Sequence, residues 1–304
     1  MQEDRQVTGK WQLTEKLKSD QAAISLRELL AKQWLLPSRF IHFLRVNQHV
    51  LVNGQYHYMN QLVHPGDSIS MIFTGEEFRT ADSHYLINPD GQLHILFENR
   101  DLLVADKPAG QKSHPNQPLE NGTLMNDAQA YLVKQKTNAY MVHRIDQATS
   151  GAVIIAKNPV VVPILDRLIS QGRIHRSYLA VVHGKLVKPQ GEFSWPIGKD
   201  PHDRRKRMVD GVNAQPAMTK YEQLTTDGEL SLLRLHLMTG RTHQIRVHLS
   251  YSGHPIVGDP LYSSDQGGPM LLHGDQQQLV LPFTMERMAI HDPLPPYFPE
   301  NLVK

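Results

Sequence analysis

Hydrophobic positions near the start of the chain recur at the spacing of two short amphipathic helices, at i, i+3 and i+4. The two sets are Leu26, Leu29 and Leu30, and then Phe40, Phe43 and Leu44. Pro37 separates them, and Ser38 is a candidate cap for the second helix. The pattern therefore predicts two helices within residues 26–46.

Strand and turn signals follow these helices. Residues 50–52 are an apolar run that leads into Asn53 and Gly54, a pair typical of a hairpin turn. Residues 68–73 alternate as a half-buried strand does, directly after Pro65, Gly66 and Asp67. Residues 76–91 are polar and predict a linker. We expect a small N-terminal domain over residues 1–75 that moves independently of the remainder.

Residues 92–304 carry short apolar runs at 93–97, 102–105, 152–156, 178–182 and 230–237. Helices are predicted at 123–134 and 159–171, and Gly172 ends the second. Strands outnumber helices without strict alternation, which favours an α+β domain with a mixed, largely antiparallel sheet.

Composition narrows the class of protein. The 304 residues are 40% hydrophobic and 20% charged, enough for a sizeable core. No apolar run approaches the roughly 20 residues of a membrane helix, and the first residues lack the layout of a signal peptide, so we expect a cytoplasmic protein. The absence of cysteine excludes disulfides and thiolate chemistry. The 17 histidines include no zinc-helix spacing, so we expect no metal.

The net charge of +2 conceals a basic middle region. Between Asp166 and Arg246 there are 14 lysines and arginines against 8 acidic residues. The densest run is Arg204, Arg205, Lys206 and Arg207. Such a run is usually a solvated loop, but this one lies between two candidate site motifs and is also a candidate for phosphate contact.

Two segments carry candidate chemistry. Residues 143–151 place Asp146 close to Arg144, just ahead of a tight turn and a buried strand. An ionised, fixed aspartate can attack a sugar carbon or an electron-poor base, and a nearby arginine favours its charged form. Residues 240–248 supply a second polar cluster that includes Arg246. Their alternation would fit a strand, but Thr242 as a cap and Gly253 as a stop favour a helix.

A third segment, residues 173–184, contains Arg176 and Tyr178 in an apolar run. In this order, the three segments resemble the signature of the RluA-type RNA pseudouridine synthases. The resemblance implies that Asp146 is the nucleophile and that Arg246 is its ion-pair partner. It also implies that Tyr178 stacks on an extruded uracil and moves a proton.

Further residues of the same segments are candidate substrate contacts. Arg144 would hold a phosphate or fill the space that the flipped base leaves, and His143 would orient the loop by a hydrogen bond. Arg176 occupies a position where this family more often has lysine. Without the resemblance, Arg144 would be interpreted as a bracing salt bridge and Tyr178 as a packed strand residue.

The N-terminal region resembles the RNA-binding domain of ribosomal small-subunit protein S-four, in which two helices pack on a small sheet. Arg39 and Arg45 lie where that family is basic. The resemblance implies an RNA-binding domain, and the alternative is an accessory domain with little affinity for RNA.

The resemblance as a whole implies a cofactor-independent isomerase that makes pseudouridine in structured RNA. Large-subunit ribosomal RNA is the first expectation and transfer RNA the second, acted on by a monomer. A noncatalytic RNA-binding or assembly factor is one alternative. A nucleoside or glycoside hydrolase that pairs Asp146 with Asp259 is another. Asp259 lies between Gly258 and Pro260, however, and an aspartate in such a turn more often caps it.

Overall fold

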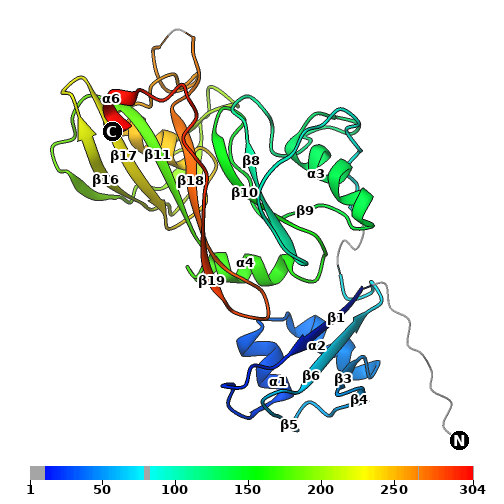
Figure 1. The fold of residues 1–304 in the computed structure, drawn as a ribbon. Coiled ribbons are helices and arrows are strands. Elements are labelled where there is room, and N and C mark those ends of the chain that lie inside the picture. The colour runs from blue at the N-terminus through cyan, green and yellow to red at the C-terminus, as the bar shows by residue number, and fades with distance from the viewer. Residues whose placement is uncertain (1–10, 79–82, 266, 304) are drawn as a thin grey trace, which may run out of the picture.

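The computed structural model describes residues 11–78, 83–265 and 267–303. The N-terminal part forms a four-stranded antiparallel sheet in the order β1-β6-β3-β4 and a two-stranded sheet of β2 and β5 (Figure 1). Its elements are β1 (Trp11–Lys16), β2 (Ile24–Ser25), α1 (Leu26–Glu28), a π-helix (Leu29–Gln33), α2 (Ser38–Val46), β3 (Val50–Val52), β4 (Gln55–Tyr56), β5 (Leu62–Val63) and β6 (Ser68–Phe73).

Local sequence accounts for these elements. The first predicted helix begins at Leu26 and widens into the π-helix, while α2 begins directly after Pro37. Asn53 and Gly54 both have positive φ, at 51° and 83°, as a hairpin between β3 and β4 requires.

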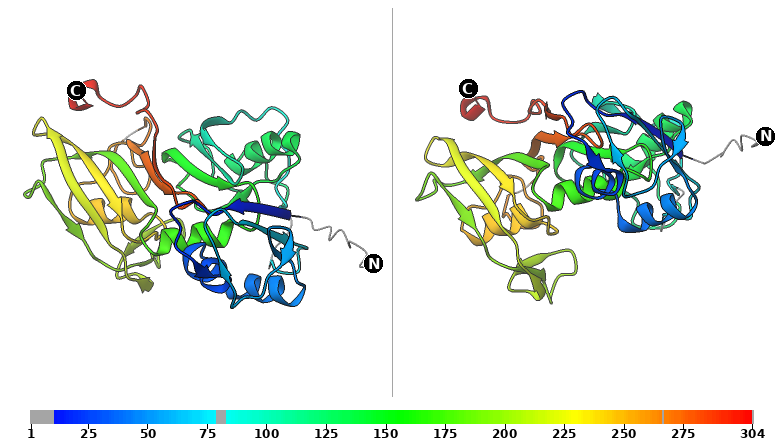
Figure 2. Two further views of the ribbon diagram at one scale, coloured as in Figure 1. Left: turned by 60° about the horizontal axis from the view of Figure 1, so that its bottom comes forward. Right: turned by 90° about the horizontal axis from the view of Figure 1, so that it is seen from below.

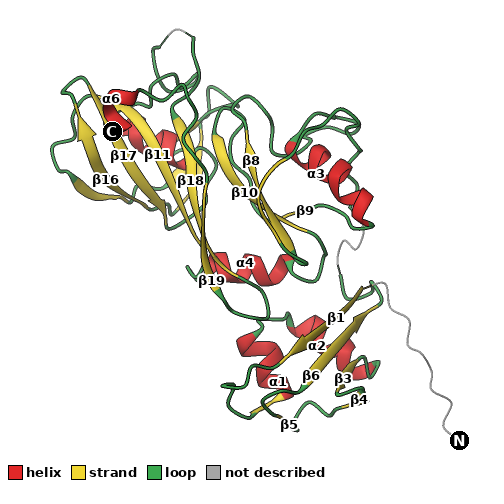
Figure 3. Cartoon of the chain, in the orientation of Figure 1, coloured by secondary structure: helices red, strands yellow, loops and turns green. Residues whose placement is uncertain are grey.

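The second part contains a ten-stranded sheet whose main order is β12-β16-β17-β11-β18-β10-β8-β7, with β9 beside β10 and β19 beside β18 (Figure 3). The pair of β10 and β18 is parallel and the other pairs are antiparallel. The predicted α+β class with a mixed, largely antiparallel sheet is therefore confirmed. A three-stranded sheet, β14-β13-β15, lies off its end.

The elements of this part are β7 (His94–Glu98), β8 (Leu102–Lys107), α3 (Leu124–Leu132), a 3-10 turn (Val133–Gln135), β9 (Tyr140–Met141), β10 (Ser150–Ala156), α4 (Val162–Ser170), β11 (His175–His183), β12 (Gln190–Phe193), β13 (Ile197–Lys199), β14 (Arg207–Val209), β15 (Val212–Gln215), β16 (Thr219–Thr226), β17 (Leu230–Leu237), α5 (Gln244–Tyr251), β18 (Leu272–Val280), β19 (Arg287–His291) and α6 (Glu300–Val303). Both helices predicted from periodicity, at 123–134 and 159–171, are present as α3 with its 3-10 turn and as α4.

Helices cover both faces of the large sheet. Leu102 and Val104 of β8 pack in one apolar cluster with α4, whereas Leu103 and Ala105 pack in another with α3 and α5. Strand alternation therefore divides β8 between two cores. The face that α3 and α5 share carries the polar segments 143–151 and 240–248 at its edge.

The N-terminal part packs against the rest of the chain, although the polar linker predicted two separate domains. One apolar cluster includes residues of both parts, among them Trp34, whose ring lies edge-on to Phe283 at 5.4 Å. Arg167 of α4 donates to the backbone carbonyls of Leu35 and Leu36, each at 2.9 Å. The turn between β18 and β19 and helix α4 both lie against the N-terminal part (Figures 1 and 2). Polar composition between the sheets did not reveal this packing, because the contacts come from distant segments.

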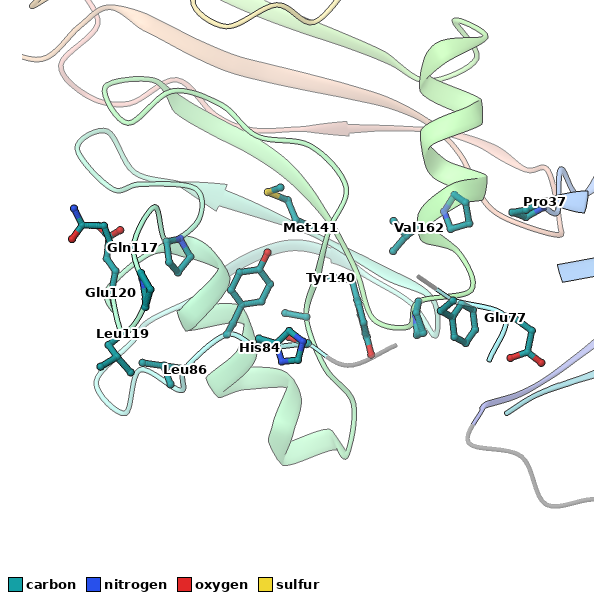
Figure 4. Close-up of a pocket in the computed structure, with 18 of the residues that line it drawn as sticks. Pro37, Glu77, His84, Leu86, Gln117, Leu119, Glu120, Tyr140, Met141 and Val162 are labelled. Atoms are coloured by element: carbon teal, nitrogen blue, oxygen red, sulfur yellow. The ribbon is translucent and has the colours of Figure 1, made fainter. Parts of the chain in front are cut away.

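A large apolar cavity, of about 800 Å³, lies away from both polar segments. Pro37 and Glu77 border one end and Leu119 the other, with Tyr140 and Met141 between them (Figure 4). None of the candidate catalytic residues lines it. Among the described helices, none is both long enough and apolar enough to cross a membrane.

Candidate active site

Asp146 lies in the loop between β9 and β10, and backbone hydrogen bonds fold this loop tightly. Thr149 N donates to Asp146 O at 3.1 Å, and Gly110 N donates to Gln147 O at 2.8 Å. Gly151, at φ +120°, pairs with Gly274 in the parallel contact with β18, where a β-carbon on Gly151 would lie 2.4 Å from Gly274 N. The close approach of the two strands thus requires glycine and fixes where the loop leaves the sheet.

A second segment, residues 107–114, holds the Asp146 loop in place through hydrogen bonds. Ser113 Oγ donates to Ile145 O at 2.7 Å and accepts from Ile145 N at 3.2 Å. Lys107 Nζ donates to three backbone carbonyls, those of Pro108, Gln111 and Gln147, at 2.8, 2.8 and 3.3 Å. The loop is thereby fixed on both sides of the nucleophile candidate, which favours a preorganised carboxylate.

Lys107 is fully buried, and burial lowers its pKa to about 7, although the charges of Asp146 and Asp106 oppose the shift. Because the unfolded chain binds this proton up to the ordinary value of 10.5, the unfolded state carries more protons between these two pH values. The contribution of Lys107 to the free energy of unfolding therefore rises as pH rises through this window.

Lys107→Met is expected to lower stability, because three carbonyls lose their donor, and to remove this rise. Urea unfolding at pH 7 and pH 9 checks it: the difference in unfolding free energy between wild type and variant should widen at pH 9. Equal differences at the two pH values would show that the buried lysine does not titrate in this range.

Helix α5 carries Arg246 to the nucleophile candidate. The preference for a helix here is confirmed, but Thr242 is not its cap. The cap is His243, in the left-handed region at φ 59°. The side chain of Gln244 binds the preceding turn instead, since its Oε1 accepts from Thr239 Oγ1 at 2.7 Å and Arg241 N at 3.0 Å. Gly253, at φ 85°, follows the helix as predicted.

Arg246 joins two aspartates. Its Nη1 lies 3.1 Å from Asp146 Oδ2, while Nε and Nη2 donate to Asp259 Oδ2 and Oδ1 at 2.8 and 2.7 Å. The side chains of Arg246 and Asp259 are 4% and 0% exposed. Burial alone would lower the pKa of Arg246, but hydrogen bonds and the charges of Asp259 and Asp146 raise it. The two-pronged partner of Arg246 is therefore Asp259.

Asp259 has the turn role that its sequence predicted and also this second role. Its Oδ1 accepts from Leu261 N at 2.9 Å and from Tyr262 N at 3.1 Å. Both of its oxygens are thus occupied in a fully buried position. A hydrolase would need a second carboxyl group free to act as acid or base, which Asp259 is not.

Tyr178 lies on β11 with its side chain in the same small cavity as Asp146, of about 120 Å³. The tyrosine is 4% exposed, and burial raises its pKa. Gly274 lies beside the ring, since a β-carbon there would be 3.4 Å from Tyr178 Cε1, in van der Waals contact with it. Arg176 and Arg144 line this cavity as well.

A second cavity, of about 550 Å³, adjoins the first at Asp146 and opens among basic side chains. Arg205 from the basic run lines it together with Arg144 and Lys112. Arg144 is exposed, and its Nη1 donates to His114 Nε2 at 2.8 Å. The structure thus brings part of the basic run beside the candidate nucleophile, while Arg204 is exposed nearby in sequence.

Three predicted substrate contacts lie elsewhere or face inward. His143 is buried, which together with the charge of Arg176 lowers its pKa to about 3, and its Nε2 accepts from Ile154 N at 3.0 Å. This hydrogen bond ties the loop to β10, which agrees with the orienting role expected for His143. Arg39 donates to the carbonyls of Glu76 and Glu77 at 2.6 and 2.9 Å. Arg39 and Arg45 line a separate cleft with Arg27 and Arg167, remote from Asp146.

Sequence reasoning missed four residues that hold the site. They are Lys107, Ser113, His243 and Tyr262. A lysine two positions after the apolar run 102–105 was a usable signal, since a charge in a buried strand needs partners. His243 stood inside a segment that had already been singled out, but nothing in the sequence placed it beside Tyr262. Across the described ranges, no cluster of three or more acidic or histidine side chains could hold a metal ion.

Known proteins share both parts of the chain. Residues 101–251 match the family described as RNA pseudouridylate synthase, and residues 13–69 match the RluD ribosomal pseudouridine synthase N-terminal domain. The uncharacterized RNA pseudouridine synthase YhcT of Bacillus subtilis is 37% identical over 259 residues, 82% of each chain. Ribosomal large subunit pseudouridine synthase D of Nitrosomonas europaea is 39% identical over 67% of this chain and 62% of its own length. The structure of human RNA pseudouridylate synthase domain containing 1 has a TM-score of 0.57 at 27% identity, over 67% of this chain and 84% of that one.

Proposed function

Because the chain belongs to the RluA-type RNA pseudouridine synthases and has an RluD-like N-terminal domain, we propose that Asp146 is the nucleophile with which it converts uridine to pseudouridine. The enzyme is an isomerase: the bond from the ribose to the base nitrogen breaks, and a bond from the ribose to a base carbon forms. One observation carries the assignment. The carboxylate of Asp146 is partly exposed in a cavity and is held by Arg246, which the buried Asp259 keeps in position.

Asp146 presents one oxygen to its partners and the other to the cavity. Arg246 and His243 both approach Oδ2, and within the described ranges no hydrogen bond to Oδ1 is found. A carboxylate oxygen without a partner is free to attack, while the other keeps the group in position. Both the ribose carbon and the base are electrophiles that this oxygen can attack.

Tyr178 and Arg144 have complementary roles in this proposal. The buried tyrosine ring beside Asp146 would stack on the flipped uracil, and its hydroxyl would move a proton. Arg144 is exposed at the rim, where its guanidinium can contact a phosphate or replace the flipped base in the stack. Arg176 lies in the wall of the same cavity and would contact the substrate there.

The proposed substrate is large-subunit ribosomal RNA, with transfer RNA as the second choice. The RluD-like N-terminal domain and the relatives named for the large ribosomal subunit support this order. Tritium release from RNA labelled at uracil carbon 5 tests it, with both RNAs offered separately. Release from ribosomal RNA alone is the expected result. Binding to both RNAs without release would favour a noncatalytic RNA-binding factor.

The N-terminal domain, residues 1–75, is proposed to bind RNA through its arginines, with residues 76–91 as a linker and 92–304 as the catalytic domain. Arg27, Arg39, Arg45 and Arg167 line one cleft, and no acidic side chain is among the described residues of its wall. Such a surface suits the phosphate backbone. Arg39 would add its charge more than new hydrogen bonds, because its guanidinium already binds two carbonyls.

The side chains of Arg204 and Arg205 in the basic run should contribute to RNA affinity and not to the chemical step. Arg204→Gln combined with Arg205→Gln is expected to weaken RNA binding several-fold and to lower the slope of log affinity against log salt by about 1 for each phosphate that the loop no longer neutralises. Turnover at saturating RNA should be unchanged. Binding titrations at several salt concentrations measure the slope, with Lys188→Gln, an exposed lysine before β12, as the matched control. An unchanged slope would mean that this loop does not meet phosphate.

A further inference from the structure

His243 stands at the nucleophile in an unusual backbone conformation. Its φ of 59° is rare for a residue other than glycine, and such strain often marks a functional position. The side chain is 13% exposed and lines both cavities that meet at Asp146. Its Nε2 lies 3.8 Å from Asp146 Oδ2. The ring therefore forms part of the wall against which a bound uracil would lie.

Hydrogen bonds on the other side of the ring determine which nitrogen carries the proton. The backbone N–H of Arg207 donates to Tyr262 Oη at 2.7 Å, and Oη lies 2.8 Å from His243 Nδ1. A tyrosine hydroxyl has one hydrogen, and Arg207 can only donate to it. Among the described residues, the hydrogen bonds found at Oη join it to Arg207 N and to His243 Nδ1. The assignment that gives both hydrogens an acceptor has Tyr262 donate to Nδ1, which leaves the proton of His243 on Nε2.

Electrostatics keep this arrangement neutral. Burial lowers the pKa of His243 first, and the charges of Arg246 and Arg207 lower it further against Asp146 and Asp259. Burial raises the pKa of Tyr262 to about 12, so the hydroxyl keeps its hydrogen. At neutral pH the ring is therefore a neutral donor that points Nε2–H toward Asp146 and the cavity.

We propose that His243 is a catalytic residue of the isomerisation, whose Nε2–H donates a hydrogen bond to the uracil anion that forms when the glycosidic bond breaks. The inference rests on the function proposed above. When Asp146 bonds to the ribose carbon, the electron pair of the broken bond stays on the uracil ring and spreads to its carbonyl oxygens. The proton stays on His243, so the uracil keeps its negative charge and can turn. Its carbon 5 then attacks the ribose carbon, which releases the Asp146 carboxylate. The hydrogen on carbon 5 leaves as a proton, and the base nitrogen gains one.

Tyr262 and the backbone of Arg207 act as positioning groups in this proposal. Removing the Tyr262 hydroxyl would free His243 to adopt the other tautomer, with a lone pair facing the anion. Arg207 closes the basic run, so the same loop that is proposed to meet phosphate also supplies the N–H that orients Tyr262. The Tyr262 hydroxyl thus links the loop that is proposed to bind RNA to His243, the proposed donor beside Asp146.

Substitutions at both residues test the catalytic role. Asparagine tolerates positive φ but is too short to reach the cavity, so His243→Asn should reduce kcat about 100-fold, as the loss of one anion-stabilising donor does. His243→Gln keeps a donor of greater reach and should recover part of this loss. Tyr262→Phe should lower kcat about tenfold, with RNA affinity within about twofold of wild type. Tyr251→Phe is the control, since Tyr251 is 60% exposed on α5. Wild-type kcat in His243→Asn would overturn the proposal.

Nitrogen chemical shifts in the RNA-free enzyme test the tautomer without any assay of activity. In protein labelled with 15N-histidine, the signal that disappears in His243→Asn identifies the residue. We expect a protonated Nε2 and a bare Nδ1 at pH 7, and a mixture of tautomers in Tyr262→Phe. A charged ring, or a proton on Nδ1, would overturn the assignment. If wild type released no tritium from any RNA, the proposed function would fail, while this measurement would still decide the tautomer.

Discussion

Asp146→Asn is expected to abolish tritium release, with a fall in turnover of roughly 10⁴-fold or more, because the amide cannot form the covalent bond to the substrate. RNA affinity should stay within a few-fold of wild type, since the carboxylate performs chemistry and does not bind phosphate. The structure adds a reason for the fold to survive: Arg246 keeps its two bonds to Asp259 when the charge on Asp146 is removed.

The measurement is tritium release under single-turnover conditions, paired with filter binding on the same RNA. Asp90→Asn is the matched control, because Asp90 is exposed in the loop before β7. Retained release in Asp146→Asn would exclude this residue as the nucleophile. A large loss of RNA affinity would instead mean that Asp146 holds the loop in shape.

Local patterns predicted much of the fold, and the motifs predicted the members of the site. The apolar spacing of residues 26–44 and the runs in 102–105 and 152–156 gave helices and strands that the structure contains. The loop with Asp146 and the helix with Arg246 were both identified, because each has a compact signature. These are short-range features, and short-range physics determines them.

The partners of those residues could not be predicted, because they depend on tertiary packing. Asp259 follows Arg246 by 13 positions and looks like a turn residue, yet its buried carboxylate fixes the arginine. The order of the strands brings the segment 107–114, which begins at the end of β8, next to the Asp146 loop. The spacing of apolar residues along the chain does not predict the order of strands in a sheet. His143 was expected among the substrate contacts from its place in the motif, but it is buried in the loop after β9, where its Nε2 accepts from Ile154 N of β10.

Arg246→Met is expected to lower the free energy of unfolding by about 3–5 kcal/mol and to abolish turnover. The loss of stability follows from Asp259, whose side chain is 0% exposed and would remain as a buried charge without its partner. Turnover falls for a different reason: Asp146 would be without the bond that holds Oδ2. Urea unfolding and tritium release measure the two effects separately, with Arg241→Met of the same segment as the control.

A double variant separates these two roles of one arginine. Adding Asp259→Asn to Arg246→Met removes the buried charge, while the amide oxygen can still accept from Leu261 N and Tyr262 N. Stability should therefore recover in large part, and turnover should stay abolished because Asp146 remains unsupported. Equal stability of the single and double variants would show that Asp259 is not an uncompensated charge in the single variant. Recovery of turnover together with stability would mean that Arg246 acts on the fold alone, and the ion pair with Asp146 would then have no part in the reaction.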